Sequence, residues 1–272
     1  MKIVKKIVHR FFGLFGYSVV DNSVVDRGIF YENLSGVFTR YLAGKPREDS
    51  IEKFLMFCAS QKDLTRSQLL QEYLYLFVRQ SKIPKGAVFL EVGVGDGVNH
   101  SNNLILERSF GMRGVLVEGD PRQRAEIHRN RVATLVPVLA GNASGEAELN
   151  LSSTPELSHV SGAVQTEIIS QNIRKAVVKV ETLNEILGEE LADDEFIDFV
   201  TIDVEGFELQ VLEGFDLTFF KPAVLCVEFN YDQKYRSELI SAIGDNYTLV
   251  FDSISACDLW FIRSDLISRV YE

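Results

Sequence analysis

The sequence Val-Phe-Leu-Glu-Val-Gly-Val-Gly-Asp-Gly, residues 88–97, decides the fold. A short apolar run ends in Glu91, and glycines then stand at alternate positions, Gly93, Gly95 and Gly97. The run predicts a buried strand that passes into a tight turn before a helix, and glycines in such a turn let the backbone approach a ligand. The dinucleotide pattern Gly-x-Gly-x-x-Gly needs glycine at position 98, which is Val98. We therefore expect a nucleotide site of another type.

Composition narrows the class of partner. The 272 residues suit one α/β domain with an appendage, or two modest domains. The net charge of -11 argues against nucleic acid, because binding to phosphates draws on Lys and Arg. The three cysteines, Cys58, Cys226 and Cys257, are far apart and predict neither a disulfide framework nor a zinc site. A reducing cytoplasm and a neutral or cationic small ligand fit best.

Residues 1–80 are predicted to form a helical extension. Residues 1–20 are basic, with apolar residues at positions 4, 8, 11, 12 and 15, which indicates an amphipathic helix that either lies on an anionic membrane surface or packs on its own domain. This stretch lacks the continuous apolar core of a membrane span or a signal peptide. Residues 21–46 are predicted to form a loop. Capping boxes at Asp49 with Glu52, and at Thr65 with Gln68, predict two further helices. We place a boundary near Ser81, so that residues 81–272 form the main domain.

From residue 85 onward, strands and helices alternate, which predicts a mainly parallel sheet covered on both faces. The expected parallel strands are 88–92, 114–118, 133–139, 199–203 and 223–229, and the expected helices are 101–110, one opened by Pro121, one capped by Thr182 and Glu185, 207–215 and 233–243. Pro137 places the third strand at a sheet edge. Strands 247–251 and 258–262 should be antiparallel, because their short connection cannot hold a crossover helix. Residues 146–151 suggest an extra strand, and the polar segment 152–176 is typical of a lid or binding loop.

Four stretches together resemble the FkbM family of class I S-adenosylmethionine-dependent methyltransferases. They are Glu-Val-Gly-Val-Gly-Asp-Gly-Val-Asn-His-Ser-Asn-Asn (91–103), Gly-Val-Leu-Val-Glu-Gly-Asp-Pro (114–121), Ile-Asp-Phe-Val-Thr-Ile-Asp-Val-Glu-Gly-Phe-Glu-Leu-Gln-Val-Leu-Glu-Gly (197–214) and Ala-Cys-Asp-Leu-Trp-Phe-Ile (256–262). The most distinctive piece is Asp-Val-Glu-Gly-x-Glu. Relatives often carry Glu-Pro-x-Pro after the second strand, whereas this chain has Glu-Gly-Asp-Pro at 118–121, which keeps the carboxylate and adds an acid.

The resemblance implies a Rossmann-like sheet of seven strands in the order 3-2-1-4-5-7-6, with the last strand antiparallel. It also implies S-adenosylmethionine-dependent O-methyl transfer to a hydroxyl of a sugar, glycan or secondary metabolite. Two other interpretations remain open. One is a binding module that keeps the fold without the chemistry, and the other is a nicotinamide-dependent oxidoreductase, which Val98 and the closing hairpin disfavour.

The candidate cofactor residues gather where strands end, because open α/β sheets bind ligands outside the carboxyl ends of their strands. They are Glu91, Gly93, Gly95, Asp96, Gly97, Ser101, Glu118, Gly119, Asn142 and Asp203. Glu118 should accept hydrogen bonds from ribose hydroxyls, unless it is a surface carboxylate. Glu91 is expected to orient the turn or the ammonium group of the ligand. Asn142 either binds the adenine amino group or forms a turn.

A hydroxyl acceptor must lose a proton, so a base is needed. Asp203 and Glu205 are the leading candidates, with His159 in the polar loop as a third. The alternative for Asp203 is a carboxylate that faces the cofactor or a metal, and for Glu205 an acid stabilised by a helix dipole. No spacing specifies a metal site and none is predicted, although Asp203, Glu205 and Glu228 would suit a divalent ion.

The acceptor is expected to be a small molecule or a glycan, with a glycan or a lipid-linked sugar preferred. We expect a cytoplasmic protein, with peripheral contact at the inner membrane face through residues 1–20 as one variant. Neither the identity of the acceptor nor the oligomeric state can be read from the sequence.

Overall fold

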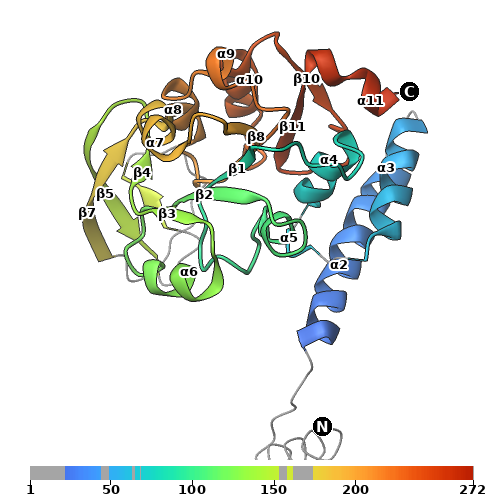
Figure 1. Ribbon diagram of the computed structural model, residues 1–272, viewed down its shortest axis with the longest axis horizontal. Coiled ribbons are helices and arrows are strands. Elements are labelled where there is room, and N and C mark those ends of the chain that lie inside the picture. Colours follow the sequence, from blue (N-terminus) through green and yellow to red (C-terminus); the bar gives the residue numbers. More distant parts are fainter. Residues whose placement is uncertain are drawn as a thin grey trace, which may run out of the picture.

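The computed structural model of the chain describes residues 22–43, 49–62, 65–67, 69–152, 158–161 and 174–271. Its centre is a seven-stranded sheet (Figure 1). The strands are β1 (Ala87–Val92), β2 (Arg113–Val117), β3 (Thr134–Val136), β8 (Phe196–Ile202), β9 (Val224–Glu228), β10 (Tyr247–Val250) and β11 (Asp258–Arg263). They lie in the order β3-β2-β1-β8-β9-β11-β10. Counted along the chain within this sheet, that order is 3-2-1-4-5-7-6, with β3 at an edge and β11 antiparallel to both neighbours.

Alternation along the strands builds two cores, one on each face of the sheet. In β1, Phe89 joins one core, whereas Val88 and Leu90 join the other, because successive side chains of a strand point to opposite faces. The first face is covered by α2 (Asn22–Ala43), α3 (Asp49–Ser60), α4 (Gln71–Val78), α5 (Leu104–Arg108), α6 (Arg124–Asn130) and α11 (Ser268–Tyr271), together with the short 3₁₀ helix Ser264–Leu266. The second face is covered by α7 (Leu183–Glu190), α8 (Glu208–Glu213), α9 (Leu217–Phe220) and α10 (Gln233–Ile243).

Helix α2 corrects the prediction of a loop over residues 21–46. It lies beside α3 at the edge of the molecule, and one end extends past the body (Figure 1). Phe30, Val37 and Tyr41 are buried in the core that α2 shares with the sheet. They stand seven and four residues apart, which is the spacing of one helical face. Apolar side chains such as Tyr31, Phe38 and Leu42 also stand on the exposed side of the helix, so the sequence shows no single apolar face.

The predicted capping box at Thr65 is also wrong. Helix α4 begins at Gln71, after Leu70 in a left-handed conformation with φ of 67°. The hydroxyl of Thr65 instead donates a hydrogen bond to the buried carboxylate of Glu72. By contrast, the capping box of Thr182 with Glu185 is present at the start of α7.

A second sheet of four strands was only partly expected. Its strands are β4 (Leu139–Ala140), β5 (Gly145–Leu151), β6 (His159–Val160) and β7 (Arg174–Glu181), in the order β4-β7-β5-β6. The expected strand 133–139 is divided, because β3 ends before Pro137 and Leu139 pairs with β7 instead. Strand β5 corresponds to the predicted extra strand. Strand β7 was not predicted, although Val178 and Val180 alternate with the outward-facing Val177 and Lys179.

Several predictions fall outside the described residues. They concern the amphipathic helix at 1–20 and most of the polar segment at 152–176. Within the described residues, no helix has both the length and the apolar character needed to cross a membrane. The division at residue 81 stays a prediction, and helices α2 to α4 share a core with the sheet.

Candidate functional site

A cavity of about 350 Å³ opens at the carboxyl ends of β1, β2, β8 and β9. This is the switch point of the sheet, where chain connections leave in opposite directions from β1, and ligands of open α/β sheets bind there. The volume falls in the range of about 300–1,000 Å³ that small-molecule pockets occupy. Residues from the turn after β1, the end of β2, the loop after β8 and the second sheet line it together.

The glycine turn after β1 forms one wall of the cavity. Gly93 has φ of +82°, and a Cβ atom built on it would lie 1.7 Å from the backbone carbonyl oxygen of Asp203. Only glycine therefore allows the turn after β1 to pack against the loop after β8. Gly95, with φ of 56°, also lines the cavity. The turn thus brings the backbone close both to the neighbouring loop and to the open space.

Glu118, at the end of β2, binds the glycine turn. Its Oε2 atom accepts hydrogen bonds from the backbone amides of Val94 at 2.9 Å and Gly95 at 3.0 Å, and its Oε1 atom accepts one from Asp120 at 2.7 Å. Burial raises the pKa of Glu118, and these amides oppose the rise. A carboxylate offers about four acceptor positions, so Oε1 has one left for a ligand hydroxyl. Glu118 and its neighbour Gly119 both line the cavity.

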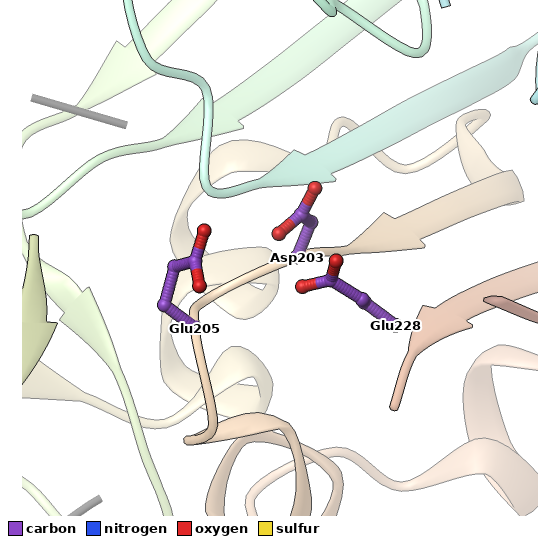
Figure 2. A group of neighbouring side chains, drawn as sticks. All are labelled: Asp203, Glu205 and Glu228. Carbon is purple, nitrogen blue, oxygen red and sulfur yellow. The ribbon is translucent and has the colours of Figure 1, made fainter. Parts of the chain in front are cut away.

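Three carboxyl groups meet at the opposite side of the cavity. Asp203 and Glu205 come from the loop after β8, Glu228 ends β9, and their side chains gather around one point (Figure 2). One oxygen of each lies within 4.8 Å of the others. Parallel strands end at the same edge of a sheet, which explains why residues so far apart in sequence converge here.

Burial and mutual repulsion keep protons on this cluster. Burial raises the pKa of Glu228 to about 12, and the neighbouring Asp203 adds to the rise. Burial also raises the pKa of Asp203, against the hydrogen bond from Glu228 and the nearby His100. Burial, with the charges of Asp203 and Glu208, raises the pKa of Glu205 to about 8. At neutral pH, Glu228 therefore shares its proton with Asp203, as two adjacent carboxyl groups cannot both ionise.

The cluster is suited to cationic or proton-transfer chemistry. A carboxyl whose pKa lies near the working pH is efficient as a general base, and Glu205 meets that condition. The negative charge that remains at neutral pH, with one proton shared between Glu228 and Asp203, also favours a cation such as a sulfonium or an ammonium group. Hard divalent cations prefer carboxylate oxygens, so these three side chains are also the ones that would hold such an ion.

Four predicted cofactor residues shape the turn from outside the cavity wall. The carboxylate of Glu91 accepts hydrogen bonds from the hydroxyl of Ser101 at 3.0 Å and the backbone amide of Asn102 at 2.8 Å, and it pairs with Arg131 at 2.9 Å. Asp96 accepts from the amides of residues 98 and 99. Gly97 presents its carbonyl to Arg131. Glu91 therefore pairs with a cation of its own chain, and it is not among the described residues that line the cavity.

Two further predicted site residues, Asn142 and His159, are not among the described residues that line the cavity. The amide of Asn142 is exposed and donates to Glu213 at 2.8 Å, and its contact with adenine stays a prediction. His159 lies on β6, paired with Asn150, and among the described residues it is not part of the cavity wall. The base candidates that remain in the cavity are Asp203 and Glu205.

Some residues of the site were missed from the sequence. The cavity is also lined by Leu139, Leu149 and Val160 of the second sheet, and by Phe207, which follows the loop at residues 203–206. The alternation in residues 146–151 predicts a strand, but its long partner β7 was not predicted, so its place beside the site could not be inferred. The sequence around Arg131 gives no signal of its role.

The fold and the site define a Rossmann-like α/β protein with a cavity at the switch point, a glycine turn after β1 and an acid at the end of β2. The methyltransferase FkbM domain matches residues 90–255. The chain therefore belongs to the FkbM family of methyltransferases, as the resemblance of its motifs indicated. No significant match to a curated protein was found.

Proposed function

We propose that the protein is an S-adenosylmethionine-dependent O-methyltransferase that transfers a methyl group to a hydroxyl of a sugar, a glycan or a secondary metabolite. The observation that carries this proposal is the cavity with Glu118 at one side and the acidic cluster at the other. Glu118 keeps an acceptor position for a ribose hydroxyl beside the glycine turn. The cluster provides negative charge for a sulfonium centre and a base for the acceptor.

Methyl transfer is an in-line displacement at a carbon attached to sulfur. Most of the catalysis then comes from holding the acceptor oxygen, the methyl group and the sulfur collinear. The hydroxyl must also lose its proton. We assign this role to the pair Asp203 and Glu205, because both lie in the cavity and the pKa of Glu205 lies near neutrality.

Calorimetric titration with S-adenosylmethionine, S-adenosylhomocysteine and NAD tests the cofactor assignment. We expect the two sulfur nucleotides to bind and NAD not to bind. Glu118→Ala should raise both dissociation constants about tenfold or more, because a hydrogen bond to a charged group contributes about 1.5–3 kcal/mol. Glu118→Gln should weaken binding as well, because its amide nitrogen only donates and must face either the amides of Val94 and Gly95 or that of Asp120.

Glu126→Ala on the exposed face of α6 is a matched control and should bind as the wild type does. Failure of folded protein to bind either sulfur nucleotide would favour a binding module. Binding of NAD instead would favour the oxidoreductase. If the sulfur nucleotides bind, formation of S-adenosylhomocysteine in the presence of sugars, glycans and lipid-linked sugars identifies the acceptor.

A further inference from the structure

Arg131 lies beneath the glycine turn, at the end of α6. Its side chain is fully buried, and it contacts Glu91 on β1 and Glu107 on α5. The Nη1 atom donates to Oε2 of Glu91 at 2.9 Å, to the hydroxyl of Ser101 at 3.0 Å and to the carbonyl of Gly97 at 3.3 Å. The Nε atom donates to Glu107 at 3.0 Å. One guanidinium group thus joins a strand, a helix and both ends of the segment 97–101.

The segment between these contacts forms part of the cavity wall. Asn99 and His100 line the cavity, and they stand between Gly97 and Ser101, which Arg131 contacts directly. His100 has φ of 59°, a conformation that costs energy in a residue other than glycine and persists only where its surroundings impose it. Glu91, itself paired with Arg131, accepts from the backbone amide of Asn102 immediately afterward.

A buried ion pair is a weak source of stability. Removing two charges from water costs about as much as their attraction returns, so replacing the pair by apolar residues of similar volume is often neutral. The planar guanidinium group nevertheless holds several acceptors in fixed directions, which Lys cannot do. The arrangement around Arg131 therefore determines the geometry of the turn more than the free energy of unfolding.

We infer that Arg131 is a positioning residue that holds the segment 97–101 in the conformation required for binding the cofactor. The inference rests on the proposed function for the identity of the ligand, and on the contacts of Arg131 for the turn itself. Arg131 does not line the cavity, so it acts through Glu91, Gly97 and Ser101.

Arg131→Lys tests this role, with Arg129→Lys on the exposed face of α6 as the matched control. We expect the dissociation constant of S-adenosylhomocysteine to rise about tenfold or more in Arg131→Lys and to stay unchanged in the control. Hydrogen exchange of the ligand-free protein should become faster in residues 95–103 and stay unchanged in β9. Unchanged exchange in residues 95–103 would overturn the inference whether or not the wild type binds the nucleotide.

The double variant Glu91→Leu with Arg131→Met separates positioning from folding. Removing Glu91 together with Arg131 should recover part of the midpoint of thermal unfolding lost in Arg131→Met alone, because only Glu107 is then left without its cation, whereas the dissociation constant should remain high and exchange in residues 95–103 fast. A double variant that regains wild-type binding and exchange would show that the pair serves folding only. If the wild type does not bind S-adenosylhomocysteine, the proposed function fails, and the exchange data still decide the role of Arg131.

Discussion

Glu205 occupies an unusual backbone position. Its φ is 56°, and Gly206 follows with φ of 94°. The buried carboxylate of Glu208 fixes this loop, because it accepts hydrogen bonds from the amides of Val204 at 3.0 Å and Gly206 at 3.1 Å, and from the hydroxyl of Tyr235 at 2.7 Å. Glu208, the last acid of the motif Asp-Val-Glu-Gly-x-Glu, therefore holds the loop that carries Asp203 and Glu205 in place. The strain at Glu205 persists because these hydrogen bonds oppose its relaxation.

The raised pKa of Glu205 makes stability depend on pH. In the folded protein the pKa is about 8, whereas an unfolded Glu has a pKa of about 4.3. The protonated carboxyl thus stabilises the fold below about pH 4.3, and this contribution is lost as the pH rises to about 8. Between pH 5 and 8, the free energy of unfolding of the wild type should fall relative to that of Glu205→Gln, by at most about 1.4 kcal/mol per pH unit. Urea unfolding at several pH values measures this. Parallel plots of unfolding free energy against pH for the two proteins would contradict this prediction. Glu146→Gln on β5 controls for the loss of one surface charge.

Helix α4 is joined to the central strand β8 by a buried polar contact. Asp198, almost fully buried in β8, accepts hydrogen bonds from the hydroxyl of Tyr75 at 2.7 Å and from Nε of Arg79 at 2.8 Å. The ring of Tyr75 also stacks on Phe199, with centroids 5.1 Å apart. This contact fixes α4 on the face of the sheet that also carries α2 and α3.

Arg79→Ala should destabilise the fold by about 3 kcal/mol. Removing one partner of a buried ion pair leaves an uncompensated charge, and the measured cost of such changes is about 3–5 kcal/mol. The control Arg129→Ala removes an exposed pair with Glu126 and should cost under about 0.5 kcal/mol. Urea denaturation of both variants at neutral pH gives the comparison. Equal losses in the two variants would show that the contact between Arg79 and Asp198 is not needed for stability.

The elements that could be predicted carry their signal locally. Alternating apolar residues, the short connection before Asp258 and the capping box at Thr182 each depend on neighbours in sequence. The acidic cluster was also foreseeable, because its members follow strands that end at one edge. Arg131 was not, since it meets Glu91 across 40 residues of sequence and only the fold brings them together. Helix α2 and strand β7 were not predicted for a related reason, because apolar side chains such as Phe38 and Val177 stand on their exposed faces and blur the periodicity.

At the scale of the whole molecule, the N-terminal helices and the sheet share one core. Phe54 of α3 stacks on Phe251, with centroids 5.2 Å apart, and meets the ring of Trp260 edge-on at 6.0 Å. Tyr73 and Leu74 of α4 belong to the same core and are fully buried. The family match spans residues 90–255. Helices α2 to α4 precede this region and pack on one face of its sheet.

A fragment of residues 81–272 should therefore not fold alone, although the motifs of the site all lie within it. Burying one large apolar side chain contributes about 1.5–3 kcal/mol, and a domain has a stability of only about 5–15 kcal/mol. The burial free energy lost with Phe54, Tyr73, Leu74 and their neighbours is comparable to the whole free energy of unfolding. Their loss also exposes an apolar face of the sheet, which favours aggregation. Near-ultraviolet circular dichroism and gel filtration of the fragment, beside the full chain, measure the outcome. A monomeric fragment with native spectra and cooperative unfolding would show that residues 81–272 are an independent domain and that the N-terminal helices only cover it.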